Sequence, residues 1–260
     1  MPEFDIIKPW DLEKITKGKI GEWIARSYYR SKGYVVWFLE AYYHGSFYSG
    51  TGKEYVNDRI VLTPLEKAIL ENFRTFDLLV VPKEDVKFIK GELLNIHHYN
   101  LLKDLFTVVI KEEGLDGLEE YLNLDIDRKI KFVKSKAEDI MSDKNKRNVG
   151  GSTYYRQQFK SRIYDIQRWF EFFRKPTKNS TEEALKEALI EMENRHNTLK
   201  RLKRLLVDIK TKWSEYDYPE RSVIKCKVRL TKLLKSLGFK CGALEINFIC
   251  PEIKLKSIML

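Results

Sequence analysis

The order of apolar segments along this chain of 260 residues predicts an α/β protein with a mixed central sheet. A helical pattern at 16–33 is followed by an apolar, aromatic segment at 34–43, which is typical of a buried strand. A second apolar segment, 78–81, is stopped by Pro82, and strand patterns return near the end of the chain. Because helix and strand patterns alternate, we expect helices to flank one sheet.

The first helix is indicated by Ile20, Ile24 and Tyr28, which recur every four residues, and by Gly33, which suits a left-handed cap. The region 44–59 is rich in glycine and polar residues, so we expect a loop there. The next helix has a well-marked start. Thr63 is a cap residue, Pro64 occupies the first helical position and Glu66 follows three after the cap.

The middle of the chain predicts strands on both sides of a helical insertion. Asp77 begins the strand at 78–81, and 85–93 is a candidate hairpin partner for it. Residues 93–124 have the apolar clusters of helices, and 129–136, "KIKFVKSK", reads as the next strand.

The last part of the chain predicts two helices followed by two strands. An aromatic stripe marks a helix at 152–175. A capping box at Ser180 opens a long helix to about Trp213, which is a candidate dimerisation element. Strands are expected at 222–230 and 243–249. The expected organisation is a core at 1–175 with a helical insertion at 93–125, a helical arm at 176–214, and C-terminal strands at 215–260 that complete the core sheet.

Composition narrows the class of partner. The formal charge is +10 and the pI is near 9.2, so nucleic acid is the first partner to consider. No apolar run approaches the roughly 20 residues that span a bilayer, and the first residues lack a secretion pattern, so we expect a cytoplasmic protein without a membrane partner. Three cysteines without CxxC spacing argue against a disulfide framework. The richness in Lys, Glu and Ile suits a thermophile.

Three segments carry a resemblance to a known family: "KGKIGEWIARSYYRSKGYVVW", "FDLLVV" and "FVKSKAED". Their order resembles that of the PD-(D/E)xK nucleases, and the first looks most like archaeal Holliday junction resolvases and restriction-type endonucleases. The resemblance implies a restriction-endonuclease-like core with a mixed sheet flanked by helices, plus a long helical insertion. It also implies a Mg²⁺- or Mn²⁺-dependent DNA nuclease, an endonuclease acting on duplex or branched DNA.

The resemblance also implies roles for particular residues. Asp77, Glu22 and Glu138 would be metal ligands, and Lys134 or Lys136 would be the catalytic lysine beside Asp77. The chemistry needs such a set, because Mg²⁺ binds a few carboxylates and keeps several waters, while a lysine stabilises charge on water or phosphate.

The E-x-K part of the family motif is degenerate, since Phe132 stands where a carboxylate is expected two residues before Lys134. Three explanations compete. The carboxylate has moved to Glu138 or to Asp139; or the catalytic strand is instead "KFIKGE", with Lys90 and Glu92; or the site is inactive and its lysines only hold phosphate.

Further residues are candidates for contact with DNA or for orientation of the site. Gln157 and Gln158 correspond to a site-orienting glutamine in RecB-like members, or lie on the solvent face of the striped helix. The candidate DNA contacts are basic residues in three clusters: Lys129, Lys131, Lys144, Lys146, Arg147, Lys200, Arg201, Lys203 and Arg204. The alternatives to a nuclease are a non-catalytic nucleic-acid-binding protein on a degenerate nuclease fold, and an assembly protein that dimerises through the 180–213 helix.

Overall fold

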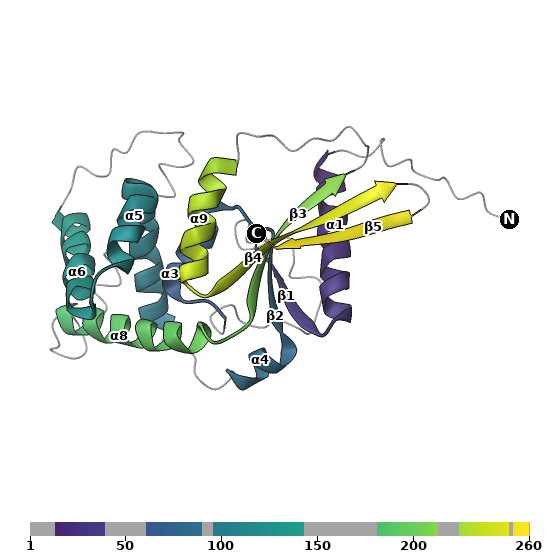
Figure 1. The fold of residues 1–260 in the computed structure, drawn as a ribbon. Helices are drawn as coiled ribbons and strands as arrows, with labels where there is room; N and C mark the ends of the chain where they lie inside the picture. Colours follow the sequence, from purple (N-terminus) through teal and green to yellow (C-terminus); the bar gives the residue numbers. More distant parts are fainter. Residues whose placement is uncertain are drawn as a thin grey trace. The chain divides into compact units, whose positions relative to one another are not determined.

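The protein is a mixed α/β protein, shown as a computed structural model in Figure 1, which describes residues 14–39, 61–89, 96–142, 181–212, 224–249 and 252–259. The chain divides into two compact units. The sheet unit comprises Met1–Lys53, Arg74–Ile89 and Arg201–Leu260, and the helical unit comprises Glu54–Phe73 and Lys90–Lys200. Within the described ranges, every helix is too short or too polar to cross a lipid bilayer.

The sheet unit contains one open sheet of five strands in the order β1-β2-β3-β4-β5. The pairs β1/β2, β2/β3 and β4/β5 are antiparallel, whereas β3 and β4 are parallel. Figure 1 shows α1 and α9 on opposite sides of this sheet. The elements are α1 (Lys14–Ser31), β1 (Tyr34–Phe38), β2 (Leu78–Pro82), α4 (Lys83–Phe88), β3 (Arg204–Lys212), α9 (Ile224–Ser236), β4 (Phe239–Ile249) and β5 (Glu252–Met259).

The core of the sheet unit lies between α1 and one face of the sheet. Ala25 and Tyr29 of α1 pack with Leu78, Val207 and Leu244 of β2, β3 and β4, and all five are buried. At Gly21 the helix passes so close to β3 that an added Cβ would collide with the Thr211 side chain and touch that of Ile209. The expected cap at Gly33 is present, with φ of 85° and its N–H donating to the Arg30 carbonyl.

The helical unit is built from α3 (Pro64–Phe73), α5 (Ile96–Leu122), α6 (Ile126–Ser142) and α8 (Thr181–Leu199). The capping box that the sequence predicts at the start of α3 is confirmed. The Thr63 N–H donates to Glu66 Oε2 at 2.8 Å, and the Glu66 N–H donates to Thr63 Oγ1 at 3.2 Å. Inside α5, Gly114 adopts φ of 65° and breaks the helix into two parts.

Four expected elements are wrong. Residues 129–136 lie in α6, and the described part of the expected strand at 222–230 lies in α9. Residues 85–88 of the expected hairpin strand lie in α4, while 90–93 are outside the described residues. The expected long helix ends at Leu199, and its second half is the central strand β3. The expected helix at 152–175 lies outside the described residues.

Burial explains these differences. Ile130 and Val133 of α6 are both buried, and their spacing of three residues puts them on one side of a helix but on opposite faces of a strand. In β3 the adjacent Leu206 and Val207 are both fully buried, which a strand covered on both faces permits.

Candidate active site

Asp77 lies immediately before β2, at the point where three strands meet. Its N–H donates to the Val207 carbonyl at 2.9 Å, and its own carbonyl accepts a bond from the Leu39 N–H at 2.8 Å. Its side-chain Oδ2 accepts a bond from the Ile209 N–H at 2.6 Å. These three bonds fix the Asp77 carboxylate against the middle of β3.

The part of β3 beside Asp77 carries a second carboxylate and an amine. Asp208 and Lys210 are two residues apart, so they project from the same face of the strand. Lys210 Nζ lies 2.9 Å from Asp208 Oδ1, and the Asp208 side chain is largely buried while that of Lys210 is half exposed. The register that pairs Leu78 with Val207, continued by one residue, brings Asp77 level with Asp208. Two carboxylates and one ammonium group therefore gather where β2 begins.

Asp208 and Lys210 lie on the face of β3 that points away from α1. Val207 and Ile209, which alternate with them, belong to the core under α1. On the face of Asp208 and Lys210 the charged side chains continue across the sheet. Lys210 is paired with Glu245 of β4, and Glu245 is paired with Lys256 of β5. Charges of alternating sign thus cross three strands in one row.

Glu22 belongs to the same unit as Asp77. The helix that carries it, α1, covers the face of the sheet opposite to Asp208 and Lys210. Glu22 directly follows Gly21, the residue of closest contact with β3, and its side chain is partly buried. Its role as a metal ligand stays a prediction. Asp208, which was not among the expected site residues, is level with Asp77 in the β2/β3 pairing.

The residues expected to complete the site at 131–139 lie in the helical unit. Lys134, Lys136 and Glu138 are on α6, so the expected E-x-K strand does not exist there. Lys136 forms an ion pair with Glu113, and the Phe132 ring packs 5.8 Å from that of Tyr121. Phe132 is therefore part of helix packing, and no carboxylate is missing at its position. The other residues proposed for the site, Lys90, Glu92, Gln157 and Gln158, lie outside the described residues.

The candidate DNA contacts divide into exposed, paired and buried groups. Lys131, Lys200, Arg201 and Lys203 are exposed, whereas Lys144, Lys146 and Arg147 lie outside the described residues. Lys129 Nζ pairs with Glu193 Oε1 at 2.8 Å.

Arg204 is not a surface contact, because its side chain is completely buried. Its Nη2 donates to the Leu237 carbonyl at 3.0 Å, and its guanidinium carbon lies 4.0 Å from the centre of the Phe239 ring. It therefore joins the beginning of β3 to the turn between α9 and β4, and its assignment as a DNA contact is wrong.

The donor set restricts which metals the site could hold. Among the described residues, no three His, Cys, Asp or Glu side chains form a cluster able to bind a metal by themselves. Cys241 is buried, and burial raises the pKa of its thiol to about 11, so it stays protonated near neutral pH. Asp77 and Asp208 fit Mg²⁺, since that ion uses one or two protein carboxylates and keeps the remaining positions for water and phosphate.

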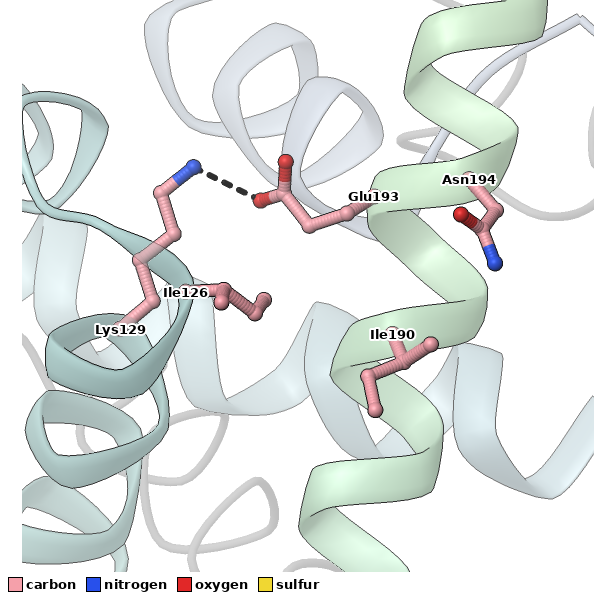
Figure 2. A pocket seen from close by; sticks show the side chains of 5 residues that line it. All are labelled: Ile126, Lys129, Ile190, Glu193 and Asn194. Atoms are coloured by element: carbon pink, nitrogen blue, oxygen red, sulfur yellow. Dashed lines mark hydrogen bonds and ion pairs between the residues drawn. The ribbon is translucent and has the colours of Figure 1, made fainter.

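A small depression lies in the helical unit, between α6 and α8. Its volume is about 180 Å³, and its lining residues are Ile126, Lys129, Ile190, Glu193 and Asn194. Figure 2 shows Lys129 and Glu193 facing each other across it. Glu193 Oε1 also accepts a bond from the Tyr121 hydroxyl at 3.4 Å. The charged groups of this depression already satisfy one another, and it is smaller than the roughly 300 Å³ of ordinary ligand pockets.

Comparisons with known proteins give no further assignment. No family model matches the sequence, and neither the curated proteins nor the solved structures contain a match to it. The geometry of Asp77, Asp208 and Lys210 is therefore the basis for a functional hypothesis.

Proposed function

We propose that the sheet unit is a PD-(D/E)xK nuclease core and that the protein is a Mg²⁺-dependent DNA nuclease. The observation that carries the proposal is the Asp-x-Lys sequence of β3, Asp208-Ile209-Lys210, fixed beside Asp77 by the 2.6 Å bond from the Ile209 N–H. In the family motif an acidic residue precedes a strand, and an acidic residue and a lysine two positions apart lie on the next strand. Asp77 takes the first place, and Asp208 and Lys210 take the second and third.

The order of elements supports the proposal independently of the motif. Within the sheet unit the order is α1, β1, β2, the short helix α4, β3, α9 and β4. The first three strands are antiparallel to their neighbours, and β4 is parallel to β3. The resemblance implied this kind of core from the sequence. The helical unit is then inserted into it between β1 and β2 and between α4 and β3.

Each residue has a definite part in the proposed chemistry. Asp77 and Asp208 would hold Mg²⁺, which supplies neutralisation of phosphate charge and a water of lowered pKa when it is bound. The Lys210 ammonium group, held 2.9 Å from Asp208 Oδ1, remains half exposed and can stabilise charge on the phosphate or on the attacking oxygen. The largely buried carboxylate of Asp208 keeps this ammonium group in place.

The outer face of α9 is suited to contact with the DNA backbone. The helix contains lysines and an arginine but no acidic residue, so its cations cannot be neutralised by pairs within the helix. The inner side of α9 carries the buried side chains of Leu230, Leu233 and Leu234. Its outer side carries the exposed side chains of Arg229 and Lys232. Such a face gives binding that depends on salt and not on base sequence.

The test uses substitutions that keep the backbone contacts. In Asp77→Asn the side-chain oxygen can still accept the bond from the Ile209 N–H, but the negative charge is lost. We expect Asp77→Asn, Asp208→Asn and Lys210→Met each to lower Mg²⁺-dependent cleavage of plasmid and branched DNA by about 100-fold or more. Their affinity for DNA, measured in Ca²⁺ by fluorescence anisotropy, should change little.

Lys134→Met is the matched control, because Lys134 lies on α6 in the helical unit. It should cleave DNA at the wild-type rate. Loss of cleavage in Lys134→Met with full activity in Lys210→Met would contradict the assignment of the catalytic lysine. A wild-type protein that binds DNA but cleaves none of these substrates with Mg²⁺ or Mn²⁺ would contradict the proposed activity.

A further inference from the structure

Trp23 is an aromatic side chain exposed on the outer side of α1. It is 43% exposed, and it is the one aromatic residue among the large apolar side chains found exposed in the described ranges. Burying an indole ring removes a large apolar area from water, so an exposed tryptophan on a packed helix is a candidate contact for a ligand.

Two neighbours hold the Trp23 ring in a defined arrangement. Its centre lies 6.3 Å from that of the Phe38 ring of β1, at an interplanar angle of 51°. The Arg26 guanidinium carbon lies 5.7 Å from the centre of the Trp23 ring and 5.2 Å from that of Phe38. We call these three residues the Trp23 cluster. Because its rings and its cation are already in contact, a ligand would immobilise little additional side-chain freedom.

The Trp23 cluster lies at the same end of the sheet as the candidate active site. Phe38 is paired with Leu78, the residue directly after Asp77, and the Leu39 N–H donates to the Asp77 carbonyl. On the helix side, Trp23 is two residues after Gly21, which is close to the Thr211 and Ile209 side chains on the α1 face of β3. The two places are on different faces of the sheet, however, so DNA that reaches both the Asp77 carboxylate and the cluster has to pass around the edge of the sheet formed by β1.

An indole face beside a guanidinium group suits an unpaired nucleotide. A base can stack on the ring while its phosphate binds the arginine, and every base has a face that permits this. The bases of a continuous duplex are stacked on each other and present only their edges in the grooves. A stacking contact is thus available to a single-stranded segment, an overhang or a branch, but not to uninterrupted duplex.

We infer, as an extension of the proposed function, that the Trp23 cluster binds an unpaired nucleotide at the end of the sheet where Asp77 lies. The substrate would then be DNA with a single-stranded segment at a duplex end or branch. Trp23 supplies the stacking surface and Arg26 a phosphate contact. Selection among DNA structures would then come from this cluster, whereas the basic face of α9 binds all DNA alike.

The experiment measures affinity for three labelled DNAs of the same sequence: a single strand, a duplex with a 5′ or 3′ flap, and a blunt duplex. Anisotropy is recorded at one salt concentration in Ca²⁺ with the full chain. Trp23→Ala should weaken binding of the single strand and the flap roughly 5- to 150-fold, the range for loss of one stacked base, and leave the blunt duplex unchanged.

Two further variants separate stacking from general apolar contact and from misfolding. Trp23→Phe keeps an aromatic face and should retain most of the affinity, while Trp23→Leu keeps apolar volume without it and should behave like Trp23→Ala. Met259→Ala, at a residue of the sheet unit that is 61% exposed, is the matched control and should bind all three DNAs like the wild type. Circular dichroism checks that each variant is folded.

The outcomes distinguish this inference from the proposed function. If Trp23→Ala binds the flap and the single strand as tightly as the wild type does, the inference is overturned, even where Mg²⁺-dependent cleavage is intact. Equal affinity of Trp23→Leu and Trp23→Phe also overturns it, because an apolar contact with another partner would then suffice. Loss of binding in Trp23→Ala, in a protein that does not cleave DNA, supports the inference and contradicts only the nuclease. Absence of binding to all three DNAs overturns both.

Discussion

At the scale of single residues, the structure separates cations and carboxylates that look equivalent in the sequence. Lys203 and Arg204 are adjacent, yet Lys203 is exposed and Arg204 is fully buried over Phe239. A run of basic residues predicts a charged surface, but it does not reveal which member faces inward. For Arg204 the direction is set by strand alternation, which appears only once 204–212 is recognised as β3.

The candidate site was predictable in part. Asp77 was identifiable because a carboxylate directly before an apolar strand is costly unless it has a specific partner. Asp208 and Lys210 were not, because they lie in a segment that continues the three- and four-residue spacing of α8. The available signal was Leu205-Leu206-Val207-Asp208, whose apolar run followed by alternation suits a buried strand.

Two glycines of α1 provide a residue-scale test of how the helix packs on β3. A Cβ at Gly18 would meet nothing within 4 Å, whereas a Cβ at Gly21 would collide with the Thr211 side chain. Alanine raises helix propensity at both positions by up to about 1 kcal/mol. Gly18→Ala should therefore stabilise the protein by about 0.5–1 kcal/mol.

Gly21→Ala should destabilise the protein by about 1 kcal/mol, because overpacking of about 1–3 kcal/mol exceeds the gain in propensity. Urea denaturation followed by circular dichroism measures both changes. If Gly21→Ala proved as stabilising as Gly18→Ala, α1 would not approach β3 as closely as described.

At the scale of elements, helices and strands are predicted correctly where the sequence shows one clear pattern. They are predicted wrongly where a helical and a strand pattern overlap in the same residues. The capping box of α3, the cap at Gly33 and the strand ended by Pro82 depend on neighbouring residues alone, and all three are confirmed. Residues 129–136 alternate like a strand and also repeat like a helix. Packing decides between the two, since α6 contacts α5 and α8.

The long helix at 180–213, through which an assembly protein was expected to dimerise, is not formed as expected. An assembly protein was conceivable while 180–213 formed a single long helix, but the helix ends at Leu199 and β3 lies at the centre of the sheet. A central strand is paired on both edges and cannot serve as a dimerisation arm.

The capping box yields the element-scale prediction. Thr63→Ala removes the acceptor of the Glu66 N–H and should destabilise the protein by about 0.5–2 kcal/mol. Glu66→Gln keeps an oxygen that can accept the bond from the Thr63 N–H, so it should preserve the reciprocal cap. Because Glu66 is fully buried and its Oε1 lies 3.6 Å from His196 Nδ1, Glu66→Ala should cost more than Thr63→Ala. Chemical denaturation gives the order, and a smaller loss in Glu66→Ala would contradict it.

At the scale of the whole molecule, the chain forms two units that are each discontinuous in sequence. The sheet unit collects three segments and the helical unit two. The sequence predicts an insertion at 93–125, whereas the compact helical unit collects residues from both 54–73 and 90–200. Contacts between distant segments define such units, and a single sequence contains no direct record of those contacts.

Each unit has its own buried core. We therefore expect a substitution that destabilises one core to increase local unfolding in that unit only. Leu118 in α5 and Leu244 in β4 are both fully buried, which makes them a matched pair. Leu118→Ala and Leu244→Ala should each cost about 2–5 kcal/mol within their own unit. Hydrogen exchange followed by mass spectrometry should show faster exchange in α5 and α8 for Leu118→Ala, and in β2 and β3 for Leu244→Ala. If either substitution accelerated exchange in both units equally, the two cores would unfold as one, and the inserted helices would have to be regarded as part of the fold that holds Asp77 beside Asp208.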